Sequence, residues 1–98
     1  MDFAHRLTEL EGLPPGRLAE ADAIAAVAVA AAGAIGIPPL GPPVVRAGPA
    51  GVVVALLCRD GHIVLHALPA EGRCLVDLVA RVPADPGRGL DVIARRLA

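Results

Sequence analysis

The sequence predicts an α+β fold: a two-layer α/β sandwich in which a mainly antiparallel sheet carries two helices on one face. Two observations predict it. Segments with strand and helix periodicity follow one another as strand, helix, several strands and a closing helix, with turn signals between them. The chain has 98 residues, enough for a single domain over residues 1–98 that buries roughly two-thirds of the unfolded surface. Because Phe3 is the only aromatic residue, aliphatic side chains must build the core.

The first half of the chain is predicted to hold one strand and one helix. Apolar and polar residues alternate over Phe3–Leu10, which is strand period, and Pro14-Pro15-Gly16 then interrupts regular structure. An alanine-rich helix follows over Arg17–Ala32 and ends near Gly33 or Gly36. Its second half has almost no polar face, so we expect cover on more than one side, either from the core or from a subunit interface.

The second half is predicted to hold four strands and a closing helix. Asp60-Gly61 between two apolar runs is a strong hairpin signal, and Pro69–Gly72 marks a second turn. Asp85-Pro86 places an N-cap before a proline at the first helical position, which predicts the start of the last helix. The predicted strands are Val44–Ala47, Val52–Cys58, His62–Leu68 and Arg73–Val82.

The turns set which residues face one another across the predicted hairpins. With Asp60-Gly61 as a two-residue turn, Arg59 faces His62. Extending the register through the next turn places Arg81 beside Asp60, so we expect a polar group near one face and edge of the sheet: His62, His66, Asp60 and Arg81. His62 and His66 lie roughly 13 Å apart along a strand, too far to share one ion, so we expect no metal.

Composition and charge exclude several functions. A net charge of −1 with scattered arginines gives no basic patch, so nucleic acid is not an expected partner. The chain has no serine and no lysine, and Thr8 is its only hydroxyl side chain, which excludes a serine nucleophile and a lysine Schiff base. No stretch is apolar enough over the length of a membrane span, so we expect no membrane insertion.

The two cysteines, Cys58 and Cys74, are too few for a disulfide framework or a zinc site. The predicted register pairs them with Ile63 and Ala67, roughly 13 Å apart along one strand, which is too far for a disulfide. Acidic residues precede the apolar run where a signal peptide would be basic. Reduced thiols and a cytoplasmic location are therefore expected.

One stretch of the chain carries a resemblance to a known family. It reads Arg59-Asp60-Gly61-His62-Ile63-Val64-Leu65-His66-Ala67-Leu68-Pro69. This stretch resembles the A-E-S-H-[IL]-x-I-H-T-W-P pattern of the prokaryotic S-adenosylmethionine decarboxylases. The match continues without a gap through Leu75–Leu78, similar to the family's A-V-D-[VI] strand, and upstream Gly48–Gly51 resembles its F-S-P-x-G loop. The resemblance implies the family's fold and a dimer.

The resemblance also has a consequence for the cofactor. Family enzymes are described as making a pyruvoyl group from an internal serine, whose hydroxyl attacks the preceding carbonyl. Gly61 occupies that serine position, and Val53 occupies the position of a processing serine or threonine. The histidine that assists processing is retained as His66. The resemblance therefore implies an unprocessed chain that has no pyruvoyl cofactor and no catalytic residue.

Other family positions have changed as well. Arg81 stands where the family has a cysteine acid, and Asp60 replaces the glutamate before the serine. Two aromatic positions that the family uses around its nucleoside substrate are Ala47 and Leu68 here. Each lost stacking contact is worth on the order of 1 kcal/mol.

Three functions follow as hypotheses, given from the most favoured to the least favoured. The first is an inactive S-adenosylmethionine decarboxylase-like protein that acts by association, as a homodimer or as the partner of an active paralogue in polyamine (spermidine) biosynthesis. The second is a small-molecule binding module for a nucleoside or polyamine ligand. The third is a decarboxylase with altered chemistry.

The residues of the second hypothesis also have simpler explanations. They are His66, Asp60, Arg81 and Leu68. His66 is better explained as a hydrogen-bonded residue of the fold than as a ligand contact. Asp60 and Arg81 are equally explained as an exposed ion pair worth about 0–1 kcal/mol.

Overall fold

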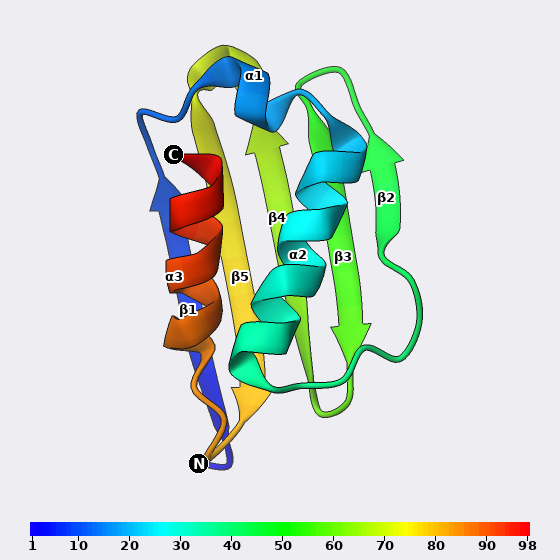
Figure 1. Ribbon diagram of the computed structural model, residues 1–98, viewed down its shortest axis with the longest axis vertical. Helices are drawn as coiled ribbons and strands as arrows, with labels where there is room; N and C mark the ends of the chain where they lie inside the picture. The colour runs from blue at the N-terminus through cyan, green and yellow to red at the C-terminus, as the bar shows by residue number, and fades with distance from the viewer.

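Five antiparallel strands form one layer of the computed structural model, which describes residues 1–98, and the helices form the other layer (Figure 1). The strand order is β1-β5-β4-β3-β2, so the first strand of the chain pairs with the last. The predicted two-layer α+β sandwich is confirmed. The strands are β1 (Phe3–Leu10), β2 (Val44–Ala47), β3 (Val52–Cys58), β4 (Gly61–Leu68) and β5 (Arg73–Arg81).

The helical layer differs from the prediction in its bounds. The single helix expected over Arg17–Ala32 is wrong: α1 (Pro15–Leu18) is followed by α2 (Ala21–Ile35). Glu20 between them has extended backbone angles, and the break lets the Leu18 side chain turn into the core, where it is fully buried. The closing helix α3 (Pro86–Leu97) begins as predicted, because the Asp85 carboxylate accepts a hydrogen bond of 2.8 Å from the Gly87 amide.

The first hairpin has a different register from the predicted one. Cys58 pairs with Gly61, so the two turn residues are Arg59 and Asp60 rather than Asp60 and Gly61. Asp60 adopts the left-handed conformation itself, at φ 55°, which aspartate tolerates better than most residues. Gly61 is therefore a strand residue. The second hairpin, which is built on the single 3-10 turn η1 (Pro69–Glu71), has the expected register.

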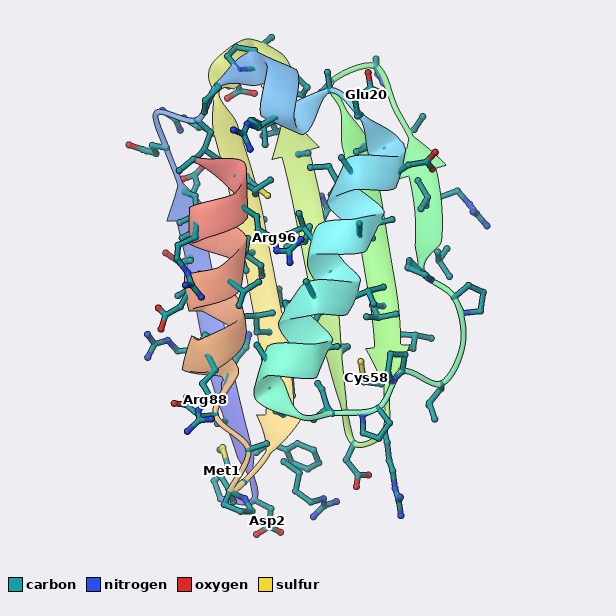
Figure 2. All side chains as sticks on the ribbon, in the orientation of Figure 1. Met1, Asp2, Glu20, Cys58, Arg88 and Arg96 are labelled. Atoms are coloured by element: carbon teal, nitrogen blue, oxygen red, sulfur yellow. The ribbon has the colours of Figure 1, made fainter.

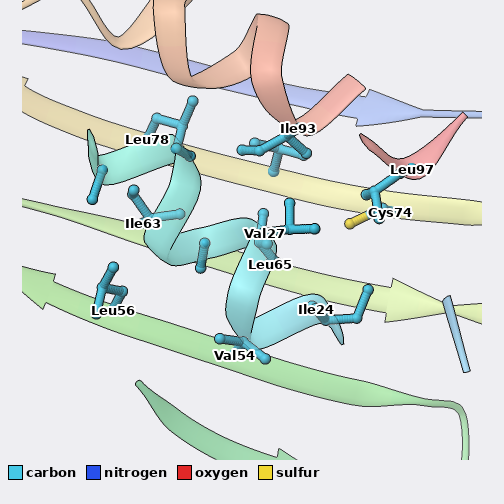
Figure 3. Packing of buried hydrophobic residues seen from close by; sticks show 14 of the residues in the cluster. Ile24, Val27, Val54, Leu56, Ile63, Leu65, Cys74, Leu78, Ile93 and Leu97 are labelled. Carbon is cyan, nitrogen blue, oxygen red and sulfur yellow. The ribbon is translucent and has the colours of Figure 1, made fainter. Parts of the chain in front are cut away.

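The core lies between the sheet and the helices (Figure 3). α2 lies over β3 and β4, and α3 lies over β1 and β5 (Figure 1). The buried side chains are aliphatic or cysteine, and no polar or charged residue is buried. Charged residues of the helical layer lie at its surface, including Glu20 before α2 and Arg88 and Arg96 on α3 (Figure 2). Fully burying each large aliphatic side chain contributes about 1.5–3 kcal/mol.

Both cysteines belong to this core as free thiols. Cys74 pairs with Ala67 as predicted, but the shifted hairpin moves Cys58 opposite Gly61 instead of Ile63. Gly61 and Ala67 are six residues apart on β4, so the two cysteines are roughly 20 Å apart along the strand direction. Burial raises the pKa of the Cys58 thiol, and it raises the pKa of the Cys74 thiol to about 11. None of the helices has the length and apolarity needed to span a membrane.

Candidate functional site

The helices leave one face of the sheet uncovered (Figure 1). The strand register places the polar side chains of the strands on that face. We call it the open face. It also carries large apolar side chains: Leu7 is 61% exposed and Leu57 is 58% exposed. The open face consists of Phe3, His5, Leu7, Glu9, Val44, Arg46, Val53, Ala55, Leu57, His62, Val64, His66, Leu68, Arg73, Leu75, Asp77, Val79 and Arg81.

A cluster of three titratable side chains lies on the open face. His5 Nε2 lies 2.7 Å from Asp77 Oδ1, and His62 Nε2 lies 3.8 Å from Asp77 Oδ2. The antiparallel register produces this arrangement, because His5 and His62 both pair with Val79, one step along β5 from Asp77 on the same face. Sequence reasoning missed the role of His5. Only the long-range pairing of β1 with β5 brings it to Asp77.

One end of the open face holds the predicted Asp60–Arg81 pair. Arg81 Nε lies 3.4 Å from Asp60 Oδ2, and the Arg81 amide donates a hydrogen bond of 3.2 Å to the Asp60 carbonyl oxygen. The Arg81 guanidinium also stacks over the Phe3 ring, 4.7 Å from its centroid. Both charged side chains are about half exposed. The pair therefore contributes at most about 1 kcal/mol to stability.

Gly61 lies at the same end, and the backbone leaves no room for a side chain there. A Cβ atom at residue 61 would overlap the carbonyl oxygen of Val79, and it would lie 3.3 Å from Ala80 Cα. Both neighbours are backbone atoms of β5, so neither can rotate away. Residue 61, which the resemblance aligns with the family's serine, is thus crowded as well as lacking a hydroxyl.

The other end of the open face has a hollow of about 280 Å³ beside the loop that joins β2 to β3. His66 and Leu68 line it from β4, and Arg46 lines it from β2. The loop approaches β4 closely at Gly51, where a Cβ atom would overlap the carbonyl oxygen of Ala67. Arg46 was not among the predicted site residues, because a lone arginine on a short edge strand gives no local signal.

The structure does not bring all four predicted ligand-binding residues together. His66 pairs with Leu75, whereas Arg81 lies six residues further along β5, roughly 20 Å away. His66 and Leu68 thus share the hollow, and Asp60 and Arg81 share the opposite end. The first hairpin does not cause this separation, since Asp60 and His66 are six residues apart in the chain and β4 pairs with β5 in the predicted register.

Comparisons with known proteins agree with this fold. Residues 4–98 match the family model described as S-adenosylmethionine decarboxylase. A crystal structure of the adenosylmethionine decarboxylase from Aquifex aeolicus VF5 is similar to the chain, with a TM-score of 0.87 and 19% sequence identity. The alignment covers 98% of this chain and 80% of that one. No curated protein matches. Since the family model spans nearly the whole sequence, the chain belongs to the S-adenosylmethionine decarboxylase family.

Proposed function

We propose that the chain is an unprocessed, pyruvoyl-free member of its family that acts by association rather than by catalysis. The crowded glycine at residue 61 carries the first part of this proposal. Forming the pyruvoyl group requires a hydroxyl nucleophile there, and the chain has no serine. Its one threonine, Thr8, pairs with Val76 of β5. Gly61 pairs with Ala80, which lies four residues, or roughly 13 Å, further along β5. The pyruvoyl group therefore does not fit the residues present.

The open face supports the second part of the proposal. A two-layer sandwich that leaves one broad sheet face bare exposes apolar side chains that a partner can bury. The molecule measures 36 Å by 24 Å across that face, enough for the ~800 Å² per partner that a standard interface buries. A second copy packed face to face about a two-fold axis perpendicular to the strands would set the His66 end of each chain against the Asp60–Arg81 end of the other.

The partner is a second copy of this chain or an active paralogue. Because the fold is kept and the catalytic serine position is lost, a paralogue of the same fold would offer a surface of matching shape. Binding to its active conformation would regulate it by the difference in affinity for its two states. We place this role in polyamine metabolism and in the cytoplasm, where both buried thiols stay reduced.

Mass spectrometry under denaturing conditions tests the absence of processing. We expect one intact chain of 9.9 kDa. Gly61→Ser should also remain intact, because the added Cβ overlaps the Val79 carbonyl and forces β4 away from β5. The variant should unfold at lower denaturant, by about 1–3 kcal/mol. Fragments that separate between Asp60 and Gly61 in the unmodified chain would refute this part of the proposal.

Native mass spectrometry of two matched variants tests association. Leu57→Glu puts a charge on the open face, and Val29→Glu puts the same charge on the outer surface of α2, where Val29 is 44% exposed. We expect the unmodified chain and Val29→Glu to be dimers and Leu57→Glu to be a monomer, since an unpaired charge in an apolar interface is costly. Dimer loss in Val29→Glu alone would instead assign the interface to α2.

The hollow beside His66 favours a second candidate function, the binding of a small molecule. It is the part of the open face where Leu68, Arg46 and the β2–β3 loop make a concave surface. Thermal unfolding with S-adenosylmethionine, adenosine or spermidine tests the ligands that the family resemblance implies. A ligand that binds only the folded chain raises its melting temperature.

A further inference from the structure

The hollow is complete within one chain. Its floor is the paired backbone of β3 and β4, and its wall is the Gly48–Gly51 part of the loop. The Gly48 amide donates a hydrogen bond of 2.8 Å to the Gly51 carbonyl oxygen, which closes the loop on itself. The tight approach of Gly51 to Ala67 then fixes the loop against β4. The wall is thus held in place without a ligand or a partner.

The charges around the hollow have one sign. Arg46 and His66 are the only titratable side chains that line it, and no carboxylate is among the lining residues. They lie in one row across the sheet, with Val53 between them, because each pairs with Val53 on β3. Two adjacent strand spacings separate them, roughly 10 Å between backbones, and the small apolar Val53 forms the surface between.

Both groups have unused hydrogen-bonding capacity. The Arg46 guanidinium donates only to the neighbouring Val45 carbonyl oxygen, at 2.9 Å, and no acid lies within 4.0 Å of it. The His66 ring makes no hydrogen bond to another residue. A guanidinium offers a planar set of N–H donors that fits a carboxylate, and an imidazole adds another donor.

From this arrangement we infer that the hollow binds a small organic carboxylate, with its acid group at Arg46 and His66 and its apolar part over Val53 and Leu68. The inference rests on the second candidate function, which it deepens by naming the ligand class, and it does not depend on association. A positively charged polyamine meets an arginine and no acid in this hollow. At about 280 Å³ the volume lies at the small end for ligand pockets, which favours a short acid over a nucleoside.

An amide NMR titration of the uniformly ¹⁵N-labelled chain tests the inference with three probes of defined chemistry. These are sodium hexanoate, hexylammonium chloride and adenosine, at constant ionic strength. We expect hexanoate to shift the amide resonances of Gly48, Gly51 and Leu68 in a saturable way. Hexylammonium has the same alkyl chain with the opposite charge, so it should shift them little.

Two arginine variants provide the matched control. Arg46→Gln should weaken hexanoate binding at least tenfold. Arg59→Gln removes the same charge from the hairpin turn at the far end of the sheet, and it should leave binding unchanged. The spectrum of each variant reports directly whether it is folded.

Each remaining outcome contradicts the inference in a recognisable way. Equal binding of hexanoate and hexylammonium would mean that only the alkyl chain is recognised. Unchanged binding by Arg46→Gln, or no shift with hexanoate at all, would remove the carboxylate site. Binding of adenosine or hexylammonium alone would keep the binding function but assign it to a different ligand class. The Leu57→Glu monomer should bind hexanoate at least as tightly as the unmodified chain, because no second copy then covers the hollow, and this separates the result from the association test.

Discussion

The two faces of strand β4 differ although their residues alternate along one stretch of eight. Ile63, Leu65 and Ala67 point toward the helices and are fully buried, whereas His62, Val64 and His66 point away and stay partly exposed. The helices of the chain cover the first set of side chains, and no part of the chain covers the second set. Residues that hold the fold and residues that carry chemistry are therefore separate sets, so site residues can change while the fold stays the same.

The largest expected difference between the two faces is the loss of free energy of unfolding when a side chain is truncated to alanine. Leu65→Ala removes a fully buried side chain under α2, and we expect it to lower the free energy of unfolding by about 3 kcal/mol. Val64→Ala on the open face should cost less than about 1 kcal/mol in the monomeric Leu57→Glu background. Urea denaturation followed by circular dichroism measures both. Equal costs would mean that the open face is as well packed within one chain as the covered face.

Alkaline pH should lower the free energy of unfolding through a cysteine of the covered face. Burial raises the pKa of Cys74 from its ordinary 9.0 to about 11, so between these values the unfolded chain has released a proton that the folded chain still holds. The free energy of unfolding is therefore unaffected by this thiol below about pH 9. It falls as the pH rises, and the loss reaches about 2 kcal/mol at pH 11. The chain has no lysine or tyrosine, so the cysteines are the side chains that titrate in this window.

The control for this pH dependence is Cys74→Val, which keeps an apolar side chain of similar size at the buried position. Its free energy of unfolding, measured by urea at about pH 8 and about pH 11, should change much less than that of the unmodified chain. Cys58 contributes to the remaining change, because burial also raises its pKa. An equally steep decline in the variant would show that the Cys74 thiol is not its source.

The exposed ion pair at the Gly61 end should give the smallest effect. Arg81→Gln removes the contact with Asp60, and we expect it to lower the free energy of unfolding by less than about 1 kcal/mol. A double-mutant cycle with Asp60→Asn isolates the pair, and its coupling energy should fall further in high salt. A coupling energy well above this value would mean that the pair is shielded from solvent by an associated chain.

Most of the fold could be predicted because its signals are local. Strand alternation and turn residues placed β1, β2 and β3 at their observed bounds, and β4 and β5 within one residue. The first hairpin register was wrong because Asp60, and not the glycine after it, adopts the left-handed conformation. Nothing local in the sequence separates a glycine needed for a turn from one needed to let two backbones approach.

The candidate site was harder to predict because it depends on distant contacts. His5 meets Asp77 only after β1 pairs with a strand about seventy residues later in the chain. The hollow requires the close approach of Gly51 to Ala67, which also gives Arg46 its setting. His66 was identified from its motif, and because the second hairpin has the predicted register, its distance from Arg81 could have been worked out from the sequence.

The strand order has a consequence for how the chain folds. β2, β3, β4 and β5 follow one another through short connections, but β1 must wait for β5, its only partner. Closing that long loop costs about 3 kcal/mol more chain entropy than closing a two-residue hairpin. During synthesis β1 leaves the ribosome before the other four strands and stays unpaired until β5 has been made. The charges of Arg6, Glu9 and Glu11 on and beside β1 then protect an exposed strand from pairing with other chains for most of that time.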